Sequence, residues 1–243
     1  MRHAAVLFDL FGTLIDVDMG RLPLTDIGGR SIRTTFPRWA GLLHDYVPNA
    51  ADVRIDEFFD DPRGVHGPDG THERPSRLRF QAALERVGCP ADRIEEGAIV
   101  LSRAHMATIA EATVLPLAHR AVLDAARSFA RVGIVTNFDD TAGGYALLER
   151  HGLLERVDTV VISEAVARRK PHPLPVVAAL RSLEVPAAEA LMIGDSARAD
   201  VGAAHAAGVD AVLIDRSGES SATLPPGTIV VRSLAEVPRR LEW

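Results

Sequence analysis

The chain has 243 residues, 47% of them hydrophobic and 25% charged, with a formal net charge of -6. This composition belongs to a globular protein with a sizeable core, and the acidic balance gives no general attraction to nucleic acid or anionic lipid. No apolar run approaches the roughly 20 residues that span a bilayer, so we expect neither a nucleic acid nor a membrane partner. The oligomeric state cannot be read from the sequence.

The first element expected is a strand over Ala4–Asp9, an apolar run that ends in an acid. Continuous apolar runs of this length are typical of strands buried on both faces. The tight turn "FGT" follows, so Asp9 is placed to project into a cleft as a nucleophile. Because Asp9 also interrupts the apolar start before a secretory segment could form, we expect a cytoplasmic protein.

The segment after this turn predicts an inserted helical unit. Helical patterns cover Ser31–Tyr46, Arg77–Val87 and Asp92–Ala112, and no strand is expected among them. Between them, "DDPRGVHGPDGTHERPS" at residues 60–76 is rich in Gly, Pro and Asp and must be a loop. The sequence leaves open whether this loop is a surface connection or a lid that touches substrate.

Strands and helices alternate in the rest of the chain, which predicts a parallel sheet with right-handed crossovers. The expected strands are Val132–Asn137, Thr159–Glu164, Ala190–Asp195, Asp210–Asp215 and Thr228–Ser233. The expected helices are Ala118–Arg131, Thr141–His151, Pro173–Leu183 and Arg198–Ala207. The fold class is therefore α/β, a Rossmann-like parallel-sheet core with an inserted α-helical unit.

Polar residues end several of these strands, and in open α/β sheets ligands bind at that edge. Thr136 offers a hydroxyl and a backbone N–H to an oxyanion, while Lys170 is the only lysine among 27 basic residues. Asp195 and Asp200 in "GDSARAD" bring two more acids towards Asp9. Carboxylates this close repel one another, and oxygen ligands with phosphate nearby suit Mg²⁺.

Four motifs in order make the chain resemble the haloacid dehalogenase superfamily of hydrolases over its whole length: "DLFGTL", "VTN", "RRKPHP" and "GDSARADVGAAHAAG". The resemblance implies a catalytic core over residues 1–16 and 113–243 and a small helical cap over residues 17–112. It implies that Asp9 is the nucleophile, that Thr136 binds the phosphoryl group and that Lys170 organises the charges.

The same resemblance implies the remaining site residues. Mg²⁺ would be held by Asp9, the backbone carbonyl of Phe11 and Asp195, with Asp200 supporting. The candidate substrate-binding residues are Gly12, Thr13 and Asn137.

Phe11 departs from the phosphatase pattern, in which a second aspartate stands two residues after the nucleophile. Such an acid protonates the leaving group and is worth about 10² to 10⁴ in rate. The dehalogenase branch also has a non-acidic residue there, because halide leaves without a proton. The fourth motif of the dehalogenase branch, however, lacks the metal-binding "GD" that is present in this chain. Possible substitutes for the acid are Asp139, Asp140 and His172.

Three functions follow from these residues. The first is a cytoplasmic Mg²⁺-dependent phosphohydrolase that acts on a small phosphorylated metabolite through an aspartyl phosphate on Asp9. The second is a 2-haloacid dehalogenase that uses Asp9 without a metal, and the third is a non-catalytic protein that binds a phosphate ligand. We favour the first, because Asp195 without a metal would repel both Asp9 and the carboxylate of a haloacid.

Overall fold

The computed structural model describes residues 3–27, 29–47, 69–218 and 223–243. By its internal contacts the chain divides into two compact units. The core unit comprises Met1–Asp16, Thr71–Glu73 and Val114–Trp243, and the insertion unit comprises Val17–Gly70 and Arg74–Thr113. The predicted cap range of residues 17–112 thus includes three residues, Thr71–Glu73, whose contacts are with the core. Residues 48–68, including the first part of the predicted loop, lie outside the described residues.

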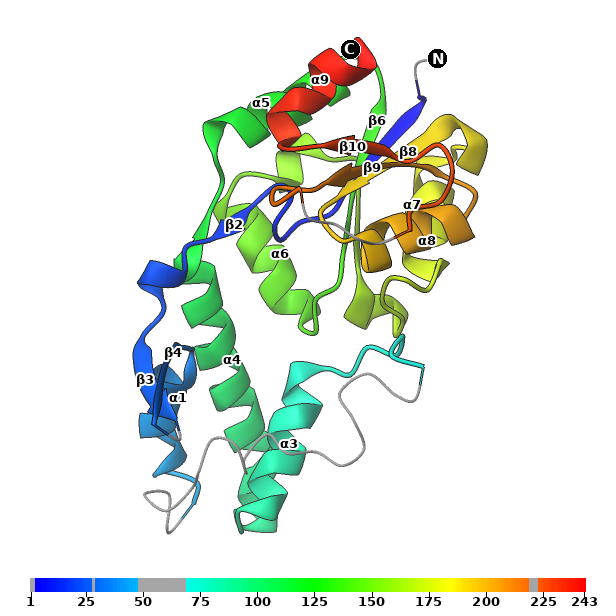
Figure 1. Cartoon of the computed structure of the whole chain (residues 1–243). Coiled ribbons are helices and arrows are strands. Elements are labelled where there is room, and N and C mark those ends of the chain that lie inside the picture. The colour runs from blue at the N-terminus through cyan, green and yellow to red at the C-terminus, as the bar shows by residue number, and fades with distance from the viewer. Residues whose placement is uncertain (1–2, 28, 48–68, 219–222) are drawn as a thin grey trace. The chain divides into compact units, whose positions relative to one another are not determined.

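A six-stranded sheet forms the centre of the core unit (Figure 1). Its strands, in spatial order, are β10 (Ile229–Val231), β9 (Asp210–Ile214), β8 (Ala190–Gly194), β1 (Ala5–Phe8), β6 (Arg131–Thr136) and β7 (Thr159–Ile162). Every pairing is parallel, with Phe8 opposite both Ile134 and Ile193. The prediction of an α/β fold built on a parallel sheet is confirmed. Strand β1 lies in the middle of the sheet, between β8 and β6.

Most connections between the parallel strands run through a helix that packs on a face of the sheet, and right-handed crossovers are the rule for such connections. Helices α7 (Leu174–Leu183) and α8 (Gly202–Ala206) lie side by side on one face (Figure 1), where Val176 and Ala204 pack with Leu7 of β1. The other crossovers use α5 (Leu117–Arg127) and α6 (Thr141–Arg150), and α9 (Val237–Leu241) ends the chain. All four residues of β1 are fully buried, as the apolar run predicts.

The insertion unit contains helices α1 (Phe36–Leu43), α3 (Ser76–Arg86) and α4 (Ile94–Ala112) around an aromatic core of its own. Trp39 meets Phe80 edge-on, with ring centroids 5.3 Å apart. Two short strands, β2 (Asp16–Val17) and β5 (Thr113–Val114), pair where the chain leaves and re-enters the core unit.

The expectation that the insertion has no strand is wrong. Strands β3 (Leu24–Ile27) and β4 (Arg30–Arg33) form an antiparallel hairpin, so the predicted helix over Ser31–Tyr46 is confined to α1. The turn explains the difference. Gly29 has a φ of 77° and donates its N–H to Asp26 Oδ1 at 3.0 Å, which is the geometry that Gly and Asp favour in hairpin turns.

Short 3₁₀ segments complete the fold at Met19–Arg21, Ala91–Arg93, Leu154–Arg156, Ser163–Val166, Ala187–Glu189 and Leu234–Glu236. A π-helical turn, Ala197–Val201, precedes α8. Within the described ranges, no helix has both the length and the apolar character that crossing a bilayer requires.

Candidate active site

Asp9 follows β1 directly and stands at the centre of the carboxyl edge of the sheet. Its backbone N–H donates to the Ile193 carbonyl at 2.9 Å, and the residue is only 7% exposed. Burial raises the pKa of this carboxyl to about 7, against the lowering effect of the Lys170 ammonium. A carboxylate in this position therefore depends on nearby cations to remain ionised.

Lys170 supplies one such cation and is itself buried. Its Nζ donates to Asp9 Oδ1 at 2.7 Å, to Asp200 Oδ1 at 2.6 Å and to the Val135 carbonyl at 2.7 Å. An ammonium group has three protons, so all three are used. Burial alone lowers the pKa of Lys170, but the carboxylates of Asp200 and Asp9 outweigh it and raise this pKa above its usual value. The ammonium is therefore held charged beside the Asp9 carboxyl.

Asn137 holds the backbone of Lys170 with both ends of its carboxamide. Asn137 Nδ2 donates to the Lys170 carbonyl at 2.9 Å, and the Lys170 N–H donates to Asn137 Oδ1 at 2.8 Å. The loop after β6 and the loop that carries Lys170 are thereby joined at the site.

Three carboxylates meet at this edge: one oxygen each from Asp9, Asp195 and Asp200 lies within 4.8 Å of the others. Asp200 is buried and accepts from Lys170 through Oδ1 and from the Ser196 N–H, at 2.9 Å, through Oδ2. Asp195 is more exposed, and burial together with the Asp200 charge raises the pKa of its carboxyl. One ammonium against three acids leaves a surplus of negative charge, which suits a hard divalent cation with oxygen ligands.

Thr136 ends β6 with a buried hydroxyl. Among the described residues its Oγ1 has no hydrogen-bond partner, although the residue is only 1% exposed. Such an unmade hydrogen bond costs about 1–3 kcal/mol, and a ligand oxygen would satisfy it. Thr136 also lines a cavity of about 160 Å³, and this hydroxyl is therefore the side-chain donor best placed for a bound oxyanion.

The cavity brings most of the predicted site residues together. It is lined by Asp9, Phe11, Thr136, Asn137, Lys170, Asp195, Ser196, Ala199 and Asp200. Two predicted residues lie outside this lining. Thr13 is fully buried, and Gly12, with a φ of 77°, approaches Asp195 so closely that a Cβ there would be 2.1 Å from Oδ2. The absence of a side chain at Gly12 thus allows the turn after β1 to approach Asp195.

Phe11 lines the cavity and packs against Phe138, with ring centroids 5.2 Å apart. Two of the three possible substitute acids have structural partners at helix starts. Asp140 accepts from the Gly143 N–H at 2.8 Å at the start of α6, and His172 Nδ1 accepts from the Leu174 N–H at 3.1 Å. An aromatic pair thus occupies the place where an acid is expected.

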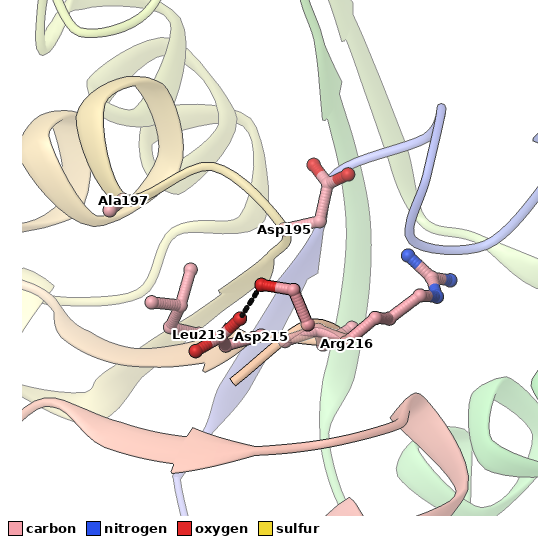
Figure 2. A pocket seen from close by; sticks show the side chains of 7 residues that line it. Asp195, Ala197, Leu213, Asp215 and Arg216 are labelled. Carbon is pink, nitrogen blue, oxygen red and sulfur yellow. Dashed lines mark hydrogen bonds between the residues drawn. The ribbon is translucent and has the colours of Figure 1, made fainter. Parts of the chain in front are cut away.

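Arg216 is a site residue that the sequence analysis did not single out. It follows β9, and its guanidinium donates to the Gly12 carbonyl and to Asp16 Oδ1, the latter at 3.2 Å. Figure 2 shows Arg216 and Asp195 on the lining of a second cavity, of about 260 Å³. The Arg216 charge also counteracts the raised pKa of Asp195. The signal was an arginine directly after the predicted strand Asp210–Asp215, at the edge where ligands bind.

Comparisons with known proteins agree with this geometry. The family model of haloacid dehalogenase-like hydrolases matches residues 3–208. The chain is 35% identical to a ribulose-1,5-bisphosphate 5-phosphatase of Halopiger xanaduensis, over 90% of this chain and 87% of the relative. It is 42% identical to a phosphoglycolate phosphatase of Rhodospirillum rubrum, over 86% of this chain and 78% of the relative.

A solved structure supports the same fold. The crystal structure of a 2-haloacid dehalogenase from Pseudomonas syringae pv. Tomato DC3000 has a TM-score of 0.73 and 21% identity, covering 100% of this chain and 99% of the other. At this identity the likeness concerns the fold alone, whereas the two curated relatives favour a phosphatase over a dehalogenase. With its four motifs at one sheet edge and a family match over most of its length, the chain belongs to the haloacid dehalogenase-like hydrolases.

Proposed function

We propose that this hydrolase is a Mg²⁺-dependent phosphatase that acts on a small phosphorylated metabolite through a phosphorylated Asp9. The surplus of negative charge around Asp9 carries this proposal, because three carboxylates face the Lys170 ammonium and Arg216 adds one further positive charge near Asp195. A haloacid is itself an anion and would add to that surplus. A divalent cation held by these carboxylates would supply positive charge to balance a bound phosphate ester.

The metal would be held by Asp9, Asp195 and the backbone carbonyl of Phe11. Asp200 would support this site without binding the metal directly, because its two oxygens already accept from Lys170 and from the Ser196 N–H. The bound ion would supply positive charge to the phosphoryl oxygens.

The chain's own residues then account for the transfer. A carboxylate oxygen of Asp9 attacks phosphorus, a new oxygen–phosphorus bond forms, and the ester bond breaks with its electron pair on the leaving oxygen. The Thr136 hydroxyl donates to a phosphoryl oxygen. Water then attacks the phosphorus of the aspartyl phosphate, which releases inorganic phosphate and restores the Asp9 carboxylate.

The substrate class follows from the relatives and from the insertion. The names of the two relatives specify phosphoglycolate and ribulose-1,5-bisphosphate, both small phosphorylated metabolites. We assign the insertion unit the role of the cap, whose side chains would select among such substrates. The cytoplasmic location and the absence of nucleic acid or membrane partners stay predictions from the sequence.

Phosphate release from a panel of small phosphate esters, with Mg²⁺ or with a chelator, tests the proposal. We expect release that requires Mg²⁺ and is abolished in Asp9→Asn. Phe11 favours the dehalogenase as the second candidate, so halide release from a 2-haloacid belongs to the same panel. Halide release in the presence of chelator would show that the protein is a dehalogenase and not a phosphatase. If neither the phosphate esters nor the 2-haloacid is turned over, the protein is a phosphate-binding protein.

A further inference from the structure

Glu73 is a buried carboxylate in the core unit, although its sequence position lies inside the insertion. Its side chain is only 2% exposed. Ser163 Oγ donates to Glu73 Oε2 at 2.5 Å, and Arg169 Nη1 lies 3.6 Å from Glu73 Oε1. Burying a carboxylate is costly unless hydrogen bonds and opposite charge compensate for it, so both partners matter to its placement.

Each partner of Glu73 leads to a catalytic loop. The Ser163 hydroxyl accepts from the Phe138 N–H at 2.9 Å. Two acceptors face its single proton, Glu73 Oε2 at 2.5 Å and the Phe138 carbonyl at 3.2 Å, and the shorter distance and the carboxylate charge favour Glu73. Phe138 directly follows Asn137 in the chain. On the other side, Arg169 directly precedes Lys170. Glu73 is therefore linked to the loop after Thr136 and to the loop that carries Lys170.

The two loops are also joined to each other, because the Asn137 carboxamide binds the Lys170 backbone at 2.9 and 2.8 Å. The contacts close a ring: Glu73, Ser163, Phe138, Asn137, Lys170, Arg169 and back to Glu73.

The backbone reinforces this ring beside Lys170. His72 pairs with Arg168 in an antiparallel bridge, and the Arg169 N–H donates to the Thr71 carbonyl at 2.8 Å. Ala167, whose carbonyl accepts from the Glu73 N–H, has a left-handed φ of 54°. A non-glycine residue keeps such a conformation only where its surroundings hold it, at a cost of about 1–2 kcal/mol.

We propose that Glu73 is a positioning residue for phosphoryl transfer, which fixes Thr136 and Lys170 relative to each other through this ring. The proposal rests on the phosphatase function proposed above. Misplacing catalytic groups by about 1 Å can cost about 10²-fold in rate. Loosening the ring should therefore lower kcat with little change in KM, because Glu73 itself is buried and does not line the cavity.

The experiment compares Glu73→Ala, Glu73→Gln and Ser163→Ala with the control Glu149→Gln, which alters an exposed acid of α6. We expect faster hydrogen–deuterium exchange in residues 136–140 and 167–172 of Glu73→Ala and Ser163→Ala, and a kcat lower by about tenfold or more. Glu73→Gln retains an acceptor for Ser163 and should recover protection at residues 136–140. The control should behave like the parent.

A double variant, Glu73→Ala with Asn137→Ala, separates positioning from general stability. If both residues act through one ring, the double variant should lose less kcat than the product of the two single losses. Multiplicative losses, or parent-like exchange and kcat in folded Glu73→Ala, would overturn the proposal. Ser163→Ala carries the same test if Glu73→Ala does not fold. A parent without phosphatase activity would refute the function, while the exchange data would still test the ring.

Discussion

The family resemblance predicts a general acid at the position of Phe11, whose ring packs against Phe138 with centroids 5.2 Å apart. An alkoxide has a pKa near that of water, about 16, so its unprotonated departure is unfavourable. The protein should therefore hydrolyse aryl or acyl phosphates far better than alkyl phosphates.

We expect Phe11→Asp to raise turnover of alkyl phosphates by about 10-fold or more, below the 10² to 10⁴ of an evolved acid, because the pocket is shaped for a ring. Steady-state rates on one aryl and one alkyl phosphate measure the effect, with Phe11→Asn as the uncharged control. Equal gains in Phe11→Asn and Phe11→Asp would show that space, not proton transfer, limits the parent.

The role of Lys170 can be tested by exchanging it for arginine. Its ammonium makes three hydrogen bonds of 2.6 to 2.7 Å in a buried space, and the planar guanidinium of arginine cannot reproduce them. Lys170→Arg should lower kcat by about 10²-fold or more. The matched control is Arg181→Lys, the reverse exchange at an exposed position of α7. A parent-like kcat in Lys170→Arg would separate this residue from the chemistry.

Among the helices and strands, the start of α6 shows whether Asp140 is a helix cap or a catalytic acid. Asp140 accepts from the Gly143 N–H at the start of α6. Asp140→Ala should cost about 1 kcal/mol in the free energy of unfolding and leave kcat unchanged. Urea unfolding and steady-state kinetics measure the two effects separately. A large loss of kcat at parent-like stability would instead identify Asp140 as the missing acid.

The elements that carry the site were predictable, because each strand of the sheet is an apolar run that ends in a polar residue. Asp9, Thr136 and Asp195 could be placed at one edge for that reason, and in the structure all three line one cavity. The β3–β4 hairpin was missed, since its short strands lack a buried face: all of Arg30–Arg33 is exposed. Periodicity, which depends on burial, gives no signal there.

The remaining site contacts were not predictable, because they join residues far apart in sequence. Arg216 lies 204 residues from the Gly12 carbonyl that it binds, and Ser163 lies 90 residues from Glu73. The spacing of residues in the sequence predicts contacts within one helix or strand, not contacts between distant segments. Glu73 was even assigned to the insertion by its position in the chain, whereas its contacts place it in the core unit.

Across the whole chain, a buried histidine of the insertion unit should make stability depend on pH. In the insertion unit, Thr35 Oγ1 lies 2.6 Å from His105 Nδ1, and Trp39 Nε1 donates to the same hydroxyl at 3.3 Å. Burial, helped by repulsion from Arg79, lowers the pKa of His105 from 6.5 to about 4. The folded unit therefore holds this imidazole neutral.

The unfolded chain binds a proton at His105 below pH 6.5, while the folded chain does so only near pH 4. Stability from this group is thus present above pH 6.5 and is lost as the pH falls towards 4, by up to about 3 kcal/mol. Fluorescence of the buried Trp39 should show a lower unfolding midpoint at pH 5 than at pH 7. His105→Gln should flatten that difference, and the exposed His205→Gln should not. An equal pH dependence in both variants would contradict the assignment.

In the proposed mechanism, Asp9 is a nucleophile that works beside a Mg²⁺ ion held by Asp195. Phosphate and halide release by the parent and by Asp195→Asn, each with Mg²⁺ and with chelator, test it most directly, with calorimetric titration of Mg²⁺ into both proteins as the binding measurement. We expect the parent to bind Mg²⁺ and to release phosphate only in its presence, and we expect Asp195→Asn to lose both properties. Parent-like Mg²⁺ affinity in Asp195→Asn, or halide release from a 2-haloacid by the parent in chelator, would contradict it.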